Sequence, residues 1–395
     1  QGRKSIISCE VDMFEKALSG SRKYWTLVLI LLALVGAGVF FYLRQLSEGL
    51  VITGMGRDVS WGFYISQFTF LVGVAASAVM VVLPYYLHDF KVFGRITILG
   101  EFLAISAVSM CVLFIFVDMG QPFRIVNVFL HPTPNSMMFW DTVVVIGYLL
   151  LNLFIGWATL GAERKGVAPP AWSKPLIYLS IPWAVSIHTV TAFLYAGIPG
   201  RHLWLTAIMA ARFLASAFAS GPALLILLCM VVRRYTRFDP GREPMQALGK
   251  IVAYAMTVNL FFIGLEFFTA YYSGIPGHSH SLEYLFFGLD GHDGLVPFMW
   301  TSMGLAILAL VLLINPSTRN NERWLATGAA AVFFSTWLDK GLGLVVGGFI
   351  PGPFESITEY SPTAPELIIS LGVWALGFLI LTLLYKITVA VREEA

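Results

Sequence analysis

The sequence predicts an all-α polytopic membrane protein with ten transmembrane helices. Only 12% of its 395 residues are charged, whereas a soluble domain carries about 25%. Hydrophobic residues make up 57% of the chain, and the mean hydropathy is +0.77. This composition excludes a soluble globular enzyme, a disordered protein and a secreted disulfide scaffold. Ten continuous apolar stretches, each long enough to cross about 30 Å of hydrocarbon as a helix, complete the prediction and exclude a β-barrel.

The ten stretches are separated by polar residues or by Pro and Gly, and the connections between them are short. We therefore expect a single transmembrane domain over residues 1–395, without an extramembrane domain. The expected spans are residues 25–43, 61–87, 97–118, 137–161, 175–197, 206–232, 248–272, 295–315, 323–346 and 366–390.

The first span is not expected to be a cleavable signal, because its apolar run begins only near Tyr24 and is long enough to cross the membrane. Nineteen of the 25 Lys and Arg residues fall in one set of alternate connections. By the positive-inside rule this set faces the cytoplasm, so the chain lies in the cytoplasmic (inner) membrane with both termini inside. Lys340 falls within a span, and the outer connections contain only Arg44, Arg57, Arg124, Arg201 and Arg212.

Runs of small residues occur in the second and sixth spans, which both run from outside to inside. One run extends over residues 73–78 and the other over residues 215–221. Small residues let helix backbones approach closely in lipid, so the runs indicate helix packing. Alternatively, they mark two parallel four-helix bundles, formed by spans two to five and six to nine.

Carboxylates lie at the ends of the third and fourth spans. Asp118 ends the third span and Asp141 opens the fourth, both at the outer boundary, with Arg124 between them. Asp118 and Arg124 can form a structural ion pair, or they can belong to a ligand site. Glu101, near the inner end of the third span, fits a snorkelling boundary residue better than a proton relay.

His188 lies near the middle of the fifth span. A histidine at that depth can ligate haem, transfer protons, bind a quinone or form a structural hydrogen bond to a neighbouring helix. A membrane b-type haem usually needs two imidazoles from facing helices, and the other histidines lie at helix ends or in loops. The cysteines Cys9, Cys111 and Cys229 form no CxxC or CxxCH motif, so we expect no haem, iron–sulfur cluster or other metal in this chain.

The seventh and ninth spans carry ionisable residues in the outer half of the membrane, namely Glu266, Asp339 and Lys340. Adjacent residues on a helix point about 100° apart, so Asp339 and Lys340 should not pair with each other. One of them can meet Glu266, either as a structural ion pair or as part of a proton path.

Polar and aromatic residues gather at the outer ends of several spans. Trp and Tyr at this depth usually form an interface belt, but their coincidence with acidic and basic residues favours a site for an amphipathic ligand with a polar ring and a lipid tail. The candidate residues for such a site are Trp61, Tyr64, Gln67, Asp118, Arg124, Asp141, His188 and Arg201.

Three short motifs lie at these outer ends: Trp61-Gly62-Phe63-Tyr64, the turn DMGQPFR at residues 118–124, and Pro199-Gly200-Arg201 followed by Trp204. Together they resemble the NrfD/PsrC family of integral membrane subunits of quinone-linked oxidoreductases. The resemblance covers nearly the whole chain. Through EKALSGSRKYW at residues 15–25 and MVVLPYY at residues 80–86, the chain looks nearest to the DsrP type of subunit, which belongs to complexes associated with sulfite reduction.

The resemblance implies two four-helix bundles with flanking helices, and a subunit that binds menaquinone near the outer face. It also implies a periplasmic ferredoxin-like iron–sulfur subunit docked there, for which the long outer connections 272–295 and 346–366 offer a face without Lys or Arg. In the DsrP type of complex, the further partners are a multihaem cytochrome c and a b-haem membrane subunit attached to a cytoplasmic iron–sulfur subunit. The lipid bilayer is the remaining partner, and no nucleic acid is expected.

The leading hypothesis is therefore a quinone-binding redox subunit of a respiratory complex of sulfur metabolism. Asp141, His188 or Tyr64 would handle protons of the ring, and Arg124 or Arg201 would stabilise its changing charge. An inert membrane anchor is one alternative. A proton-coupled secondary transporter is another, although most prolines lie near helix ends and not at the midplane breaks typical of transporters. The proton-path candidates are His188, Glu266, Asp339 and Lys340.

Overall fold

The computed structural model describes residues 16–394 and contains ten helices long and apolar enough to cross a membrane, which confirms the predicted number. Arg3, Lys4, Cys9 and Glu15, which entered the sequence-based predictions, lie outside the described residues. The spans are α2 (Arg22–Glu48), α3 (Phe63–Ala75) with α4 (Val79–Leu87), α5 (Thr97–Asp118), α7 (Met137–Lys165), α8 (Ser173–Ala196), α9 (Met209–Tyr235), α10 (Arg242–Ser273), α12 (Val296–Ile314), α14 (Glu322–Thr336) with η4 (Trp337–Gly343) and α15 (Leu344–Gly347), and α16 (Ala364–Glu394).

Short helices connect the spans, and residues 16–394 form no strand beyond an isolated bridge between Leu289 and His292. One of the short helices, α11, interrupts the outer connection before α12. The short helices are η1 (Leu50–Ile52), η2 (Lys91–Arg95), η3 (Pro122–Val126), α6 (Asn127–Leu130), α11 (Pro276–Phe286) and α13 (Pro316–Arg319).

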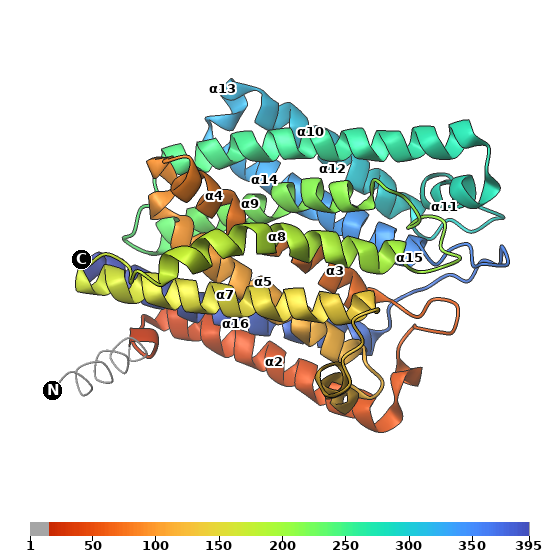
Figure 1. The fold of residues 1–395 in the computed structure, drawn as a ribbon, viewed down its shortest axis with the longest axis horizontal. Helices are drawn as coiled ribbons and strands as arrows, with labels where there is room; N and C mark the ends of the chain where they lie inside the picture. Colours follow the sequence, from red (N-terminus) through yellow and green to blue (C-terminus); the bar gives the residue numbers. More distant parts are fainter. Residues whose placement is uncertain (1–15, 395) are drawn as a thin grey trace.

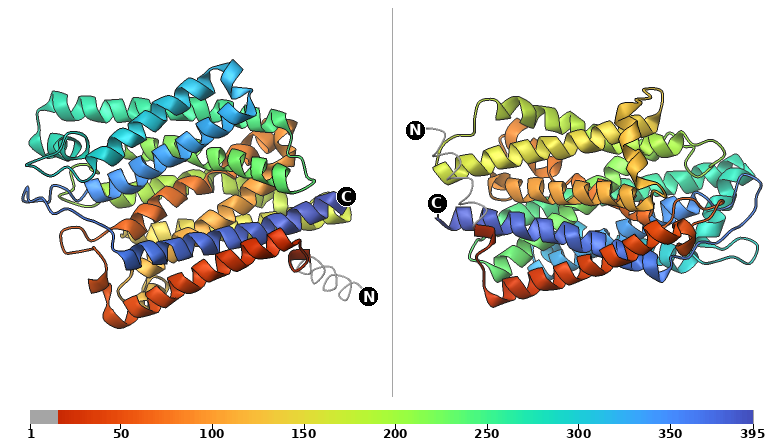
Figure 2. Two further views of the ribbon diagram at one scale, coloured as in Figure 1. Left: turned by 180° about the vertical axis from the view of Figure 1, so that it is seen from behind. Right: turned by 90° about the horizontal axis from the view of Figure 1, so that it is seen from below.

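The spans pack as two groups of four with a flanking pair. The first bundle contains α3 with α4, α5, α7 and α8, and the second contains α9, α10, α12 and α14. Helices α2 and α16 lie side by side, and α16 packs on α5 at the edge of the first bundle (Figures 1 and 2). Successive spans alternate in direction, so the molecule has two ends. We call the end with Arg95, Lys165, Arg234 and Arg392 the basic end, and the opposite end, where α11 lies, the loop end (Figure 1).

The small-residue runs lie where the two bundles meet. A Cβ atom added to Gly221 of α9 would lie 2.7 Å from the backbone nitrogen of Ser77, and one added to Gly73 of α3 would lie 3.2 Å from Ser220 Oγ. The backbones approach so closely that only small residues fit between them. The packing interpretation of these runs is therefore confirmed.

Two spans depart from the continuous helices that the sequence predicted. The second span divides into α3 and α4 at a turn over residues 76–78, and the ninth span becomes a π-helix over Trp337–Gly343. The two irregular spans touch, because a Cβ added to Gly341 would lie 3.2 Å from the carbonyl oxygen of Ser66. Short π-helical segments often occur at functional sites. The positions of the prolines had suggested that helix breaks occur only near the helix ends. These two irregular segments lie inside their spans, so that expectation was wrong.

The long connection before α16 is anchored by a buried glutamate. Glu366 Oε1 accepts a hydrogen bond from the Tyr360 hydroxyl at 2.7 Å, and Oε2 accepts one from the Gly54 backbone nitrogen at 2.7 Å. Burial and the Glu366 carboxylate raise the pKa of Tyr360 well above its ordinary value, so the phenol keeps its proton and remains a donor. The Tyr360 oxygen also accepts from the Phe63 backbone nitrogen at 2.7 Å, which fixes the start of α3 at the loop end.

Candidate functional site

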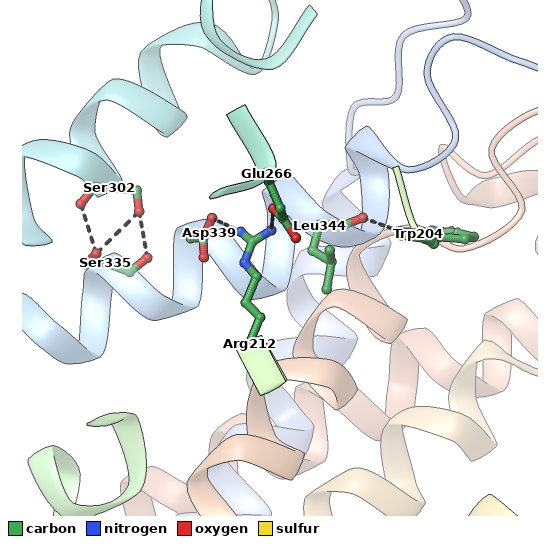
Figure 3. A network of polar contacts seen from close by, with 7 residues as sticks. All are labelled: Trp204, Arg212, Glu266, Ser302, Ser335, Asp339 and Leu344. Carbon is green, nitrogen blue, oxygen red and sulfur yellow. Dashed lines mark hydrogen bonds and ion pairs between the residues drawn. The ribbon is translucent and has the colours of Figure 1, made fainter. Parts of the chain in front are cut away.

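Four aromatic rings form a cluster at the loop end, which we call the aromatic cap: Trp61, Tyr195, Trp204 and Phe349. The ring centroid of Trp61 lies 5.4 Å from that of Tyr195, and the centroid of Trp204 lies 5.0 Å from that of Phe349. Tyr195 and Trp204 are fully buried. Trp204 Nε1 donates to the Leu344 carbonyl oxygen at 2.8 Å (Figure 3). The cap therefore packs α3 and α8 of the first bundle against the ninth span.

Arg201 brings positive charge to this cap. Its Nη1 donates to the Phe349 carbonyl oxygen at 2.9 Å, and its guanidinium carbon lies 4.5 Å from the centre of the Phe349 ring. Partial burial lowers the pKa of Arg201, and the nearby Asp58 carboxylate opposes that shift. Because an arginine pKa begins above 12, the side chain stays charged at neutral pH.

A polar stripe runs along α8 beneath the cap, formed by His188, Thr191 and Tyr195. These residues are three and four positions apart, so they share one helix face, and each is fully buried. Thr191 Oγ1 donates to Asp141 Oδ1 of α7 at 2.6 Å, and the Tyr195 hydroxyl is hydrogen-bonded to Thr69 of α3. Neither ring nitrogen of His188 has a hydrogen-bond partner among the described residues. The α8 stripe thus links Asp141 and His188 to the aromatic cap that contains Trp61.

Tyr64 and Gln67 are buried as expected, but they bond to other helices. The Tyr64 hydroxyl donates to Gln45 Oε1 of α2 at 2.7 Å. Gln67 Oε1 accepts from Trp337 Nε1 at 2.9 Å and from Trp374 Nε1 at 3.0 Å. Both side chains therefore connect α3 to the flanking helices and to the ninth span, and not to the α8 stripe.

The hypothesis of an ion pair between Asp118 and Arg124 is wrong. No described ion pair contains either residue, and Arg124 is exposed on η3. The Oδ1 atom of Asp118 is instead buried without a hydrogen-bond partner in the described part of the chain. The turn that leads into η3 leaves the arginine side chain in solvent, where a distant partner would cost side-chain entropy and gain little.

Arg212 of α9 joins two carboxylates inside the second bundle (Figure 3). Its Nη1 donates to Glu266 of α10, and its Nη2 donates to Asp339 Oδ1 of the ninth span at 2.6 Å. The three side chains are no more than 10% exposed. We call this group the arginine triad. It lies in the half of the second bundle nearer the loop end, because Arg212 is in the first turn of α9.

The role of Arg212 was not predicted from the sequence. Arg212 was counted with the outer connections, and Glu266 was expected to meet Asp339 or Lys340 directly, whereas the arginine bridges the two acids. A signal was present, because Arg212 falls inside the expected span 206–232. Two buried carboxylates near each other also require a cation.

Lys340 does not pair with Asp339, as the sequence predicted from the 100° between adjacent helix residues. Its Nζ lies 3.4 Å from the Phe213 carbonyl oxygen and 4.2 Å from the centre of the Phe213 ring. A Cβ added to Gly73 would lie 3.3 Å from the same nitrogen. Lys340 therefore occupies the junction between the bundles, while Asp339 faces the interior of the second bundle.

Two small cavities adjoin the arginine triad. One is lined by all three triad residues, and the next is lined by Asp339, Asn259, Ser302 and Ser335. Each has a volume of about 10 Å³, which is room for about one water molecule. Ser302 and Ser335 exchange hydrogen bonds at 2.8 Å (Figure 3), and Asn259 Oδ1 is buried without a partner among residues 16–394. Polar groups therefore continue from the triad toward the basic end.

The family model for polysulphide reductase NrfD matches residues 51–347. This chain belongs to the NrfD family. The match includes the aromatic cap apart from Phe349, the α8 stripe and the arginine triad, so these features lie in the region that defines the family. The NrfD chain is a multi-pass integral membrane protein, in agreement with its ten candidate spans.

Relatives of this NrfD chain include membrane subunits of several oxidoreductases. It is 24% identical to the Hdr-like menaquinol oxidoreductase integral membrane subunit of Archaeoglobus fulgidus, over 97% of each chain. It is 24% identical to a selenate reductase subunit of Mesobacillus selenatarsenatis, over 93% of each chain. It is 22% identical to the menaquinone reductase integral membrane subunit of Nitratidesulfovibrio vulgaris, over 91% of this chain and 90% of the relative. The similarity in each case extends over nearly the full length.

Among residues 16–394, no three or more His, Cys, Asp or Glu side chains are placed to hold one metal ion. Cys111 and Cys229 are both buried and form no disulfide with each other. The described side-chain atoms that are buried and unpaired in the first bundle belong to a histidine, two carboxyl groups, an amide and a threonine hydroxyl. These groups bind protons and hydroxyl or carbonyl groups, so their chemistry fits a polar organic ring.

Proposed function

We propose that this chain is the menaquinone-binding membrane subunit of a respiratory oxidoreductase complex. Two relatives that match it over 90% or more of its length carry menaquinol or menaquinone in their names. The observation that carries the proposal is His188, a fully buried imidazole with two unpaired ring nitrogens, one turn from the Thr191–Asp141 hydrogen bond. An imidazole in this position can bind a hydroxyl group of a quinol and take its proton.

We place the quinone ring against the α8 stripe, beneath the aromatic cap. Oxidation of a quinol releases two electrons and two protons. His188 and Asp141 are suited to accept the protons, and Arg201 adds positive charge at the cap above them. The electrons leave for an acceptor in a partner subunit at the loop end. Trp61 and Tyr195 would confine the ring by contact with its faces or edges.

The partners are part of the same proposal. The loop end would dock a periplasmic ferredoxin-like iron–sulfur subunit. In a complex of sulfur metabolism the further partners would be a multihaem cytochrome c and a b-haem membrane subunit with its cytoplasmic iron–sulfur subunit. The basic end would face the cytoplasm, because Arg212 is internal and only Arg44, Arg57, Arg124 and Arg201 remain at the loop end.

The second bundle would move protons during turnover. The arginine triad, the two water-sized cavities and the Ser302–Ser335 pair form a polar series across half of the bundle. Ionisable groups inside a membrane commonly mark proton paths. Lys340 lies between this series and the first bundle, where it can respond electrostatically to charge at the quinone site.

The quinone site can be tested by binding a menaquinone analogue to the purified complex. We expect His188→Leu to weaken binding about tenfold or more, because one hydrogen bond in a buried site is lost. Thr189→Ala is the matched control, since Thr189 is the next residue of α8 and its hydroxyl bonds only to the Val185 carbonyl of its own helix. Unchanged affinity in His188→Leu would show that the quinone ring does not bind against the α8 stripe.

Proton movement can be tested in liposomes that contain the complex and an internal pH dye. We expect Glu266→Gln to lose translocation beyond the two protons released by each quinol, while quinol oxidation continues, because Gln still accepts from Arg212 but cannot ionise. Glu48→Gln, on the exposed surface of α2, should behave as the wild type. Unchanged translocation would leave Glu266 with a structural role only. Solute uptake without any quinol would instead favour the secondary transporter.

A further inference from the structure

An acidic side chain near the basic end belongs to neither group described above. Glu101 of α5 is only 2% exposed, and its Oε2 has no hydrogen-bond partner among the described residues. Gly156 of α7 faces it, because a Cβ added there would lie 3.7 Å from Oε2. The sequence suggested a snorkelling residue at the boundary, but a snorkelling side chain reaches water and this one does not.

The charged and titratable groups that interact electrostatically with Glu101 come from three helices. They are Tyr86 of α4, Tyr148 and Glu163 of α7, and Arg392 of α16. The cation among them is already engaged, because Arg392 Nε donates to Glu163 Oε2 at 3.0 Å and Arg392 Nη2 donates to Glu163 Oε1 at 2.9 Å. This two-point pairing neutralises Arg392 and leaves Glu101 without a counter-ion in contact.

A surface hollow lies beside this ion pair at the basic end. It has a volume of about 840 Å³ and is lined by residues that include Arg95, Arg237, Phe238 and Arg392. Arg392 also donates to the Arg95 carbonyl oxygen. Arg95 ends η2, and Glu101 lies in the second turn of the helix that follows it, α5. Arg392 therefore lines the hollow and also holds Glu163, which lies two turns beyond Gly156 on the same face of α7.

We propose that Glu101 is a proton-accepting site of the first bundle, neutral at rest, that exchanges its proton with the hollow at the basic end through Glu163. An unpaired carboxylate in an apolar interior is too costly to persist, so the group carries a proton. No Glu163 oxygen is within hydrogen-bond reach of Glu101 Oε2, so the exchange uses a bridging water. The O–H bond of Glu101 breaks as this water accepts the proton, the water gives a proton to a Glu163 oxygen, and Glu163 then releases it to solvent. No electron is transferred, and one positive charge moves with the proton.

This site extends the proposed proton movement to the first bundle. Its physiological role rests on the proposed function, whereas its protonation is a property of the resting chain. Glu266 differs from Glu101 in the resting chain, because that carboxylate is held by Arg212 and is then ionised. Two buried glutamates of one chain should thus differ in protonation at neutral pH.

Infrared spectroscopy of the purified complex without quinol tests whether Glu101 is protonated and Glu266 is ionised. We expect a neutral carboxylic acid C=O band with a component that shifts in deuterated water, is lost in Glu101→Gln and persists in Glu266→Gln. Glu163→Gln should slow the deuterium shift without removing the band. An identical band in the wild type and Glu101→Gln would overturn the proposal.

A second measurement needs no substitution and covers the case in which Glu101→Gln does not assemble. A hydrophobic carbodiimide adds covalently to protonated carboxyl groups in apolar surroundings. We expect mass spectrometry of the treated wild-type complex to find the adduct on the peptide with Glu101 and not on the peptide with Glu266, whereas the reverse pattern would overturn the proposal. If His188→Leu binds the menaquinone analogue as tightly as the wild type while Glu101 still carries the adduct, the proposed quinone site is contradicted and the protonation of Glu101 is not.

Discussion

Replacing Arg212 by methionine should prevent stable assembly of this subunit. The substitution leaves Glu266 and Asp339 buried without their shared cation. Removal of one partner from a buried ion pair costs about 3–5 kcal/mol, and the stability of a whole domain is only about 5–15 kcal/mol. The yield of the intact complex and its thermal unfolding midpoint in detergent measure the effect.

Two further variants, a matched control and a compensating combination, test whether unpaired buried charge causes the loss of assembly. Arg57→Met removes an exposed arginine at the loop end and should leave assembly unchanged. Combining Arg212→Met with Glu266→Gln and Asp339→Asn removes all three charges, and assembly should largely return because no buried charge is left unpaired. Wild-type yield and unfolding midpoint in the Arg212→Met variant would contradict a structural role for the triad.

The triple variant also separates folding from proton movement. If the triad only stabilises the bundle, the uncharged version should translocate protons as well as the wild type. If the triad carries protons, the assembled triple variant should oxidise quinol without translocation, because Gln, Asn and Met cannot exchange protons at neutral pH. Buried ion pairs are weak evidence for stability alone, since apolar replacements are often tolerated.

The number of spans and most of their limits could be predicted from the sequence, because length and hydropathy determine what crosses a bilayer. The third span was expected at residues 97–118 and is found at Thr97–Asp118. The break at residues 76–78 was not predicted, because the span around it is largely apolar and the three residues, Ala76, Ser77 and Ala78, include no proline or glycine. The turn depends on contacts made after folding, such as the Ser77 hydroxyl donating to the Gly100 carbonyl oxygen at 3.2 Å.

The composition of the candidate site was only partly predictable. Asp141 and His188 were chosen by depth and chemistry, and Asp141 is hydrogen-bonded to Thr191, which lies one turn from His188 on α8 and whose type carried no signal. Tyr64 had the right depth but faces α2, because the direction of a side chain around a helix depends on which neighbours the helix acquires. Periodicity gives the buried face of a helix. It does not give the partner helix.

Asp141→Asn should lower menaquinol oxidation about 100-fold or more, which is the usual size of a lost proton-transfer group. The amide is nearly the same size as the carboxyl group, and its oxygen can still accept the hydrogen bond from Thr191 Oγ1. The complex should therefore assemble normally and bind a menaquinone analogue with little change. Turnover with a quinol donor and an artificial acceptor measures the loss.

The control for this substitution is Asp89→Asn, which changes an exposed aspartate at the basic end that pairs with the exposed Lys91. It should keep wild-type turnover, because Asp89 lies at the end of the molecule opposite the aromatic cap. Full activity of Asp141→Asn together with unaltered analogue affinity would exclude Asp141 as a proton acceptor. In that case His188, whose ring nitrogens have no partner among the described residues, would have to accept both protons, one after the other. A fall in turnover with unchanged affinity would instead place Asp141 in the chemical step, because a group that acts only in binding alters affinity first.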